Sequence, residues 1–168
     1  MTTARTIAKL LTDRKLTLAT AESCTGGLIS HTLTNIPGSS KFYLGGIVAY
    51  ANDIKVRFLE VKADLIRKHG AVSAPVAQAM ALGIRRKTKA DLSLSVTGIA
   101  GPFGGTRTKP VGLVFIAASS LRKTVVKRFL FKGTRLEIKR QATKAALNLI
   151  EKILQGTRHS AHDTRKKR

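Results

Sequence analysis

Residues 21–27, with the sequence AESCTGG, are the part of the chain best suited to carry chemistry. An apolar run at 16–20 precedes them and an amphipathic run at 28–33 follows, which predicts a buried strand, a glycine turn and a helix. This order would present Ser23 beside unpaired backbone N–H groups at a helix N-terminus, where negative charge is stabilised. Ser23 could then act as a nucleophile while the same amides stabilise an oxyanion. The alternative is that Ser23 or Thr25 merely caps the helix.

A serine nucleophile needs a base, and histidine is poorly placed to supply it. The four histidines are predicted within a helix, near a helix end and in the C-terminal tail: His31, His69, His159 and His162. None has cysteine or acidic companions at zinc-ligand spacing, so we expect no metal site. A lysine can serve instead where burial or nearby cations lower its pKa from about 10.4 toward neutrality. Lys55, three residues after Asn52, is the best placed lysine; the alternative is an ordinary solvated side chain.

A second glycine-rich turn, residues 97–106 (TGIAGPFGGT), follows another predicted strand. Its small residues would let backbone amides approach a phosphate, so the loop resembles an anion cradle. It contains neither a Walker sequence nor a dinucleotide-binding fingerprint, and the alternative is a plain connector. Arg135, at the start of the last predicted helix, could hold a phosphate or carboxylate through paired hydrogen bonds.

Helical and strand patterns alternate along most of the chain and end with a pair of strands. Helices are predicted at 6–11, 28–35, 53–59, 63–69, 73–89 and 134–154, and strands at 16–20, 47–50, 92–97, 111–118 and 124–131. We expect Asn52 to cap the helix that follows it. The alternation predicts an α/β fold, a three-layer α/β/α sandwich with a mixed, mostly parallel sheet. Ligands of such folds gather at the carboxyl ends of strands, where both glycine turns and residues 50–52 would lie.

The length of 168 residues fits one domain, at 1–155, followed by a basic tail at 156–168 that we expect to be disordered. The single cysteine, Cys24, excludes an internal disulfide and suits a reducing compartment. The N-terminus lacks the apolar region of a signal peptide, and the apolar stretches are only about as long as a strand. We therefore expect a cytoplasmic protein without a membrane partner.

Basic residues outnumber acidic residues by 31 to 9, which gives a net charge of +22. The tail contributes five basic residues and one acid, so +18 remains on the preceding 155 residues. Such a surface favours anionic ligands and can bind nucleic acid without sequence preference. Six Phe, two Tyr and no Trp make a poor stacking platform for single strands. The alternative function is thus a catalytically weak, nucleic-acid-associated protein.

Five segments taken together resemble a known family. AESCTGG at 21–27, GIVAYANDIK at 46–55, GAVS at 70–73, TGIAGP at 97–102 and KPVG at 109–112 resemble, in order and spacing, the CinA carboxy-terminal domain family of nicotinamide-nucleotide amidases. The likeness covers about residues 5–154. The chain departs at Ala49 and Ala51, where the family commonly has hydroxyl residues, and at Thr134, where it commonly has aspartate.

The resemblance implies an amidase without metal or cofactor that converts nicotinamide mononucleotide, an anionic pyridine mononucleotide, to nicotinate mononucleotide and ammonia. The catalytic residues that it implies are Ser23 as nucleophile, Lys55 as base and Thr97 at the head of the second glycine turn. Amides near Thr25, Gly26 and Gly27 would hold the oxyanion. The other substrate-binding positions that it implies are the following: Tyr50, Gly98, Gly101, Gly105 and Arg135. We also expect a homo-oligomer.

Overall fold

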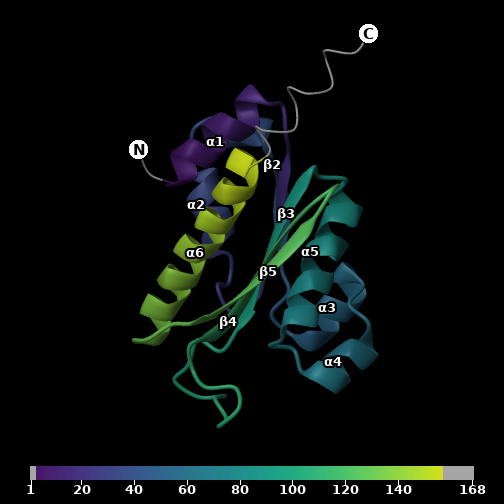
Figure 1. The fold of residues 1–168 in the computed structure, drawn as a ribbon, viewed down its shortest axis with the longest axis vertical. Coiled ribbons are helices and arrows are strands. Elements are labelled where there is room, and N and C mark those ends of the chain that lie inside the picture. Colours follow the sequence, from purple (N-terminus) through teal and green to yellow (C-terminus); the bar gives the residue numbers. More distant parts are fainter. Residues whose placement is uncertain (1–2, 157–168) are drawn as a thin grey trace.

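The computed structural model describes residues 3–156, so the predicted tail beyond Gly156, with His159 and His162, lies outside the described residues. A single sheet lies between two layers of helices (Figure 1). One face carries α1 (Thr3–Asp13), α2 (Leu28–Thr34) and α6 (Arg135–Gly156). The other carries α3 (Asn52–Leu59), α4 (Ala63–His69) and α5 (Ala74–Thr88). The predicted three-layer α/β/α sandwich is therefore confirmed.

The sheet has five strands in the order β2-β1-β3-β4-β5. Their bounds are Leu18–Glu22 for β1, Tyr43–Val48 for β2, Leu92–Gly98 for β3, Leu113–Ser120 for β4 and Thr124–Leu130 for β5. β1 pairs in parallel with β2 and β3, whereas β4 pairs antiparallel with β3 and β5. Only β4 therefore runs against the other strands, and the sheet is mixed and mostly parallel as predicted. The carboxyl ends of β2, β1 and β3 meet at one edge of the sheet.

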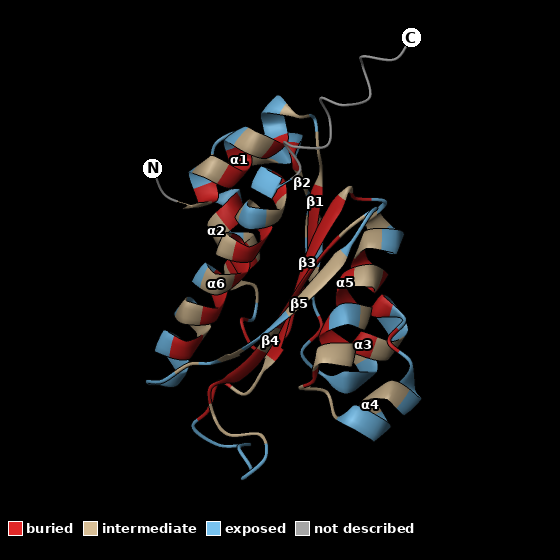
Figure 2. Cartoon of the chain, viewed as in Figure 1, coloured by how far each residue is buried: buried red, intermediate tan, exposed pale blue. Residues whose placement is uncertain are grey.

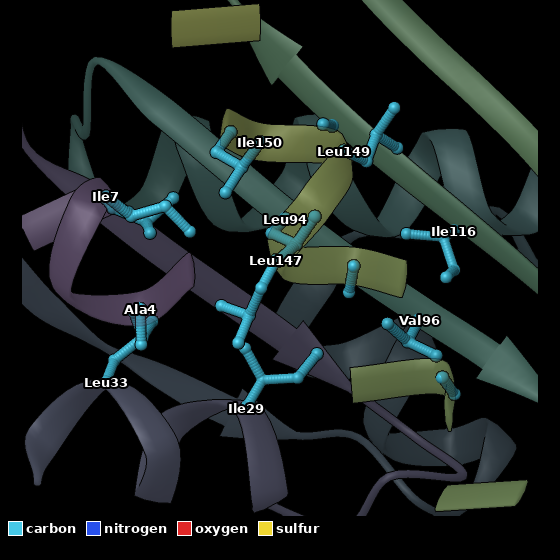
Figure 3. Packing of buried hydrophobic residues seen from close by; sticks show 14 of the residues in the cluster. Ala4, Ile7, Ile29, Leu33, Leu94, Val96, Ile116, Leu147, Leu149 and Ile150 are labelled. Atoms are coloured by element: carbon cyan, nitrogen blue, oxygen red, sulfur yellow. The ribbon is translucent and has the colours of Figure 1, made fainter. Parts of the chain in front are cut away.

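Apolar side chains fill the space on both faces of the central strands, which are buried along their length (Figure 2). On one face, Leu94 and Val96 of β3 pack against α2 and α6 (Figure 3). On the other face, Ala19 and Ala21 of β1 meet a cluster centred on α5. Within residues 3–156, none of the helices has the length and apolar character needed to cross a membrane.

The strand β3 alternates apolar and hydroxyl side chains, although both of its faces are buried. Three hydroxyls on one face donate to backbone carbonyls of α5 and the segment before it: Ser93 to Ala81 (2.6 Å), Ser95 to Ala77 (2.6 Å) and Thr97 to Ala71 (2.9 Å). Alternation of this kind is typical of a strand with one face in water. Here the hydroxyls are buried at little cost because each has an acceptor.

Most predicted elements are present, but the first two strands differ from the prediction in their ends. β1 extends to Glu22, two residues past the predicted end, because hydrogen bonds allow this carboxylate to be buried. β2 covers Tyr43–Val48 rather than 47–50, and its glycine pair is part of the strand. Gly46 is required there because an added Cβ would lie 2.1 Å from Thr20 Oγ1.

Gly83 of α5 lies against the end of α3. An added Cβ at Gly83 would lie 1.9 Å from the backbone oxygen of Leu59, so the two helices would have to separate. Overpacking of this kind typically costs about 1–3 kcal/mol or more, which exceeds the gain of about 1 kcal/mol in helix propensity. We expect Gly83→Ala to lower the free energy of unfolding measured in urea. Gly156→Ala, where nothing lies within 4 Å, is the matched control. Equal stability of the two variants would contradict this account.

Candidate active site

A pocket of about 280 Å³ opens at the carboxyl ends of β1, β2 and β3. Side chains and backbone from five separate segments line it. Six of the predicted site residues are among the lining residues: Ser23, Tyr50, Lys55, Thr97, Gly98 and Arg135. The parallel arrangement of three strands brings their following loops to one place, which is why residues 23, 50 and 98 meet here.

The turn that carries Ser23 is organised by Glu22. Its buried carboxylate accepts hydrogen bonds from the amides of Gly27 (3.0 Å), Ile29 (3.1 Å) and Ser30 (2.8 Å), and from the Ser30 hydroxyl (2.6 Å). The N-cap of α2 is Gly27, at φ 92°, and no side chain of the cap residue bonds the helix. The alternative that Ser23 or Thr25 caps α2 is therefore wrong.

The amides of this turn are not all free to bind an oxyanion. Gly26 donates to the Ser23 carbonyl (3.0 Å) and Gly27 donates to Glu22, so the expectation that these two amides stabilise an oxyanion is corrected. In the part of the chain that the structure describes, the amides of Cys24 and Thr25 donate to no other residue. The hydroxyl of Thr25 is buried without a partner. Cys24 and Thr25 follow Ser23 directly, so their amides are the donors left for an oxyanion.

Lys55 is a buried amine, with 1% of its surface exposed. Its Nζ donates to the carbonyls of Ala49 (2.8 Å) and Tyr50 (3.0 Å). Burial lowers the pKa of Lys55 below its usual 10.5, opposed by the charge of Cys24 in its ionised form. A neutral amine has two N–H bonds and a lone pair, and the two carbonyls accept both of those bonds. In that neutral form the lone pair would be left to accept a proton. Because Lys55 is buried, the alternative of a solvated lysine is wrong.

Ser23 is 8% exposed and lines the same pocket as Lys55. Within the described residues its hydroxyl makes no hydrogen bond, and none joins it to Lys55 Nζ. Catalytic hydrogen bonds are often long in an unliganded site and shorten when substrate binds. The fold therefore places the predicted nucleophile and base in one pocket, without a hydrogen bond between the Ser23 hydroxyl and Lys55 Nζ in the described residues.

Cys24, the neighbour of Ser23, is a weaker candidate for the nucleophile. Burial raises the pKa of its thiol from 9.0 to about 12. Because the thiolate is the reactive form, a thiol of this pKa is nearly inert near neutrality. Ser23 therefore remains the predicted nucleophile of the turn.

Arg135 closes the mouth of the pocket by joining two of its walls. Its Nη1 donates to the Gly101 carbonyl (2.7 Å) and its Nη2 to the hydroxyl of Tyr50 (2.6 Å). Gly101 holds Arg135 through its backbone and does not itself line the pocket. Gly105 also lies outside the lining, and an added Cβ there would come within 2.9 Å of the Val111 amide. Both glycines therefore shape the loop.

The start of α6 is held by a capping box, which places Arg135 in the first turn. The amide and hydroxyl of Thr134 donate to Glu137 (2.7 and 2.8 Å), and the amide of Glu137 donates back to the Thr134 hydroxyl (3.4 Å). The bonds from Thr134, the backbone bond above all, lower the pKa of the Glu137 carboxyl. Threonine thus caps the helix at the position where the family commonly has aspartate.

Several pocket residues were missed as site residues by the sequence reasoning: Cys24, Asn52, Ala71, Val72, Ile99, Ala100, Phe103 and Gly104. Asn52 was predicted to cap α3, but the N-cap is Ala51 and no side chain of the cap residue bonds the helix. Position in the YAND segment was the only available signal for Asn52. Histidine is not among the lining residues. Between residues 3 and 156, His, Cys, Asp and Glu nowhere gather in groups of three that could hold a metal ion.

The buried thiol offers a direct test of this geometry. We expect iodoacetamide at pH 8 to leave Cys24 largely unmodified in the folded protein, because its thiolate fraction is roughly a thousandfold below that of an ordinary thiol. Mass spectrometry after timed quenching measures the reaction. The same protein unfolded in urea is the control and should react fully. Rapid alkylation of the folded protein would contradict a buried, protonated thiol.

The CinA C-terminal domain family model matches residues 1–154. A CinA-like protein of Desulfotalea psychrophila is 51% identical over 153 residues, which cover 91% of this chain and 37% of that protein. The chain thus spans little more than a third of the curated relatives that it matches. Two solved structures have a TM-score of 0.88. The competence/damage inducible protein CihA of Agrobacterium tumefaciens is 39% identical, covering 91% of this chain and 93% of its own. A CinA superfamily protein of Klebsiella pneumoniae is 31% identical, covering 92% and 96%. The chain belongs to the CinA C-terminal domain family.

Proposed function

We propose that this chain hydrolyses the carboxamide of nicotinamide mononucleotide to nicotinate mononucleotide and ammonia. The observation that carries the proposal is a buried lysine of lowered pKa that shares one pocket with an unbonded serine hydroxyl. A lysine in that state can take a proton from a serine, and a serine so activated attacks carbonyl carbon. The sequence resemblance to nicotinamide-nucleotide amidases supplies the substrate.

The reaction can be written with groups of this chain and one water. Lys55 takes the proton of Ser23 as Ser23 Oγ bonds to the amide carbon, and the resulting oxyanion accepts hydrogen bonds from the amides of Cys24 and Thr25. Lys55 then gives its proton to the amide nitrogen, the carbon–nitrogen bond breaks and ammonia leaves. Lys55 next takes a proton from water as the hydroxide adds to the acyl carbon, and gives that proton to Ser23 Oγ as the ester bond breaks, so that the serine hydroxyl is restored and the released carboxylic acid ionises in water. Lys55 thereby returns to its neutral form.

The remaining predicted residues position the pocket or the anionic end of the substrate. The Thr97 hydroxyl donates to the Ala71 carbonyl, so we assign it the role of holding that wall of the pocket in place. Arg135 lies at the mouth, and its partners, a carbonyl and a phenol, leave its charge uncompensated. The phosphate of the substrate would lie against Arg135, with Tyr50 and Gly98 along its path.

Ammonia release from nicotinamide mononucleotide tests this function. We expect Ser23→Ala to abolish turnover, and Lys55→Met to lower kcat by at least about a hundredfold because it removes the general base. Lys152→Met, an exposed lysine at the far end of α6, is the control and should leave turnover unchanged. Full activity of either site variant would contradict the mechanism.

The pH dependence adds an independent readout of the same mechanism. Because neutral Lys55 is the active form, kcat/KM should rise with pH and level off above the apparent pKa of Lys55, which lies below 10.5. A protonated lysine as the active form would give a rate that falls over the same range. That opposite slope would overturn the assignment of Lys55 as the base.

The net charge of +22 favours nucleic-acid binding as a second candidate function. On this account the protein retards duplex DNA in a gel near 0.15 M salt, the physiological ionic strength. Because contacts to phosphates release counterions, the affinity should fall steeply as salt is raised. Absence of retardation at that salt, with ammonia release intact, would reject this candidate and leave the amidase.

A further inference from the structure

Asn52 lines the active-site pocket and has no part in the mechanism described above. As the first residue of α3 it was free to serve as a helix cap, but the N-cap is Ala51 in an extended conformation (φ −78°, ψ 154°). Among the described residues, the carboxamide of Asn52 has no hydrogen-bond partner. The side chain is thus a polar group in the pocket that no structural role occupies.

Asn52 lies beside the base. Residues three apart on a helix share a face, so the side chains of Asn52 and Lys55 start about 5–6 Å apart. Both line the pocket that contains Ser23. A group bound by Asn52 is therefore held close to the atoms that exchange protons.

The other polar side chains of the pocket already make hydrogen bonds or serve the proposed proton transfer. Thr97 donates to Ala71, and the Tyr50 hydroxyl accepts from Arg135. The guanidinium of Arg135 carries donors only, and the lone pair of Lys55 is needed for the proton of Ser23. The hydroxyls of Thr97 and Tyr50 keep further lone pairs but are already held by these bonds, whereas Oδ1 of Asn52 is an acceptor that no bond among the described residues holds, so it is open to a substrate N–H.

We propose that Asn52 is the residue that selects an amide substrate, by accepting a hydrogen bond from the carboxamide nitrogen through Oδ1. This inference rests on the proposed amidase function and adds a specificity determinant to it. The bond would turn the leaving nitrogen toward Lys55, which delivers the proton as the carbon–nitrogen bond breaks. The product carboxylate has no N–H to offer, so the same contact is lost when the reaction is complete and the acid is released.

An ester of the same acid has no N–H on its leaving group and gains nothing from Asn52. The role therefore predicts a loss confined to amides. Asn52 is exposed, so water can pair with Oδ1 when the substrate has no N–H, and the discrimination is that of one net hydrogen bond.

The test compares nicotinamide mononucleotide with the methyl ester of nicotinate mononucleotide, using formation of nicotinate mononucleotide as the common readout. We expect Asn52→Ala to lower kcat/KM for the amide by roughly 3- to 10-fold, the net value of one neutral hydrogen bond. For the ester, kcat/KM should change by less than about twofold, which also shows that the variant is folded. Asn35→Ala, an exposed asparagine outside the pocket, should leave both rates unchanged.

The outcomes separate this role from the function on which it rests. An equal loss of kcat/KM on amide and ester would assign Asn52 a structural role and overturn the proposal. A variant whose kcat/KM is unchanged for both compounds would overturn it too. A wild-type protein that hydrolyses neither compound would overturn the proposed function, and the role of Asn52 with it. A wild-type protein active on the ester but not the amide would overturn the selection of amides by Asn52 while keeping the nucleophile.

Discussion

A lysine amine withdrawn from water is the constraint on which the site depends. The segment that leads from β2 into α3 folds back over its own side chain, so that the carbonyls of Ala49 and Tyr50 bond Lys55 Nζ. Removing a charged amine from water disfavours its protonated form, and this desolvation is the main reason for its lowered pKa. Because both contacts come from backbone carbonyls, alanine at position 49 does not remove them. The carbonyls that bond Lys55 thus come from residues close to it in the sequence, and the rest of the fold shields its amine from water.

The turn that begins at Ser23 is positioned by a buried carboxylate, that of Glu22. Glu22 satisfies the first amides of α2 and the Ser30 hydroxyl, which is in turn bonded by Tyr43 (2.7 Å). Tyr43 also contacts Thr20 (2.6 Å), so β1, β2 and α2 are joined by one polar network, and burial raises the pKa of the Tyr43 phenol. A buried network is stabilising only when its members are satisfied, and its geometry is then rigid. That rigidity holds the turn that begins at Ser23.

The basic character of the chain has a local consequence at the pocket. The ion pairs among the described residues involve exposed side chains of α1, α3, α4 and α5, such as Lys9 with Asp13 and Lys87 with Glu60. Exposed pairs of this kind contribute little to stability. Arg135 instead bonds neutral groups, so its charge is available to an anionic ligand at the pocket mouth.

The layered fold, the mixed sheet and the meeting of two glycine turns followed from the sequence, because the periods of apolar residues and the glycine positions are local properties of the chain. The same local pattern placed Ser23 and Lys55 after strands that end at one edge of the sheet, whereas their pairing as nucleophile and base came from the resemblance to the family. Only the tertiary structure decided that Glu22, rather than Ser23 or Thr25, holds α2, and that Gly26 and Gly27 have no free amides. Likewise, Asn52 turned out to line the pocket instead of capping α3. Hydrogen-bond partners of this kind depend on which groups, often distant in the sequence, lie close to each donor in the fold. A periodic pattern of residues does not reveal them.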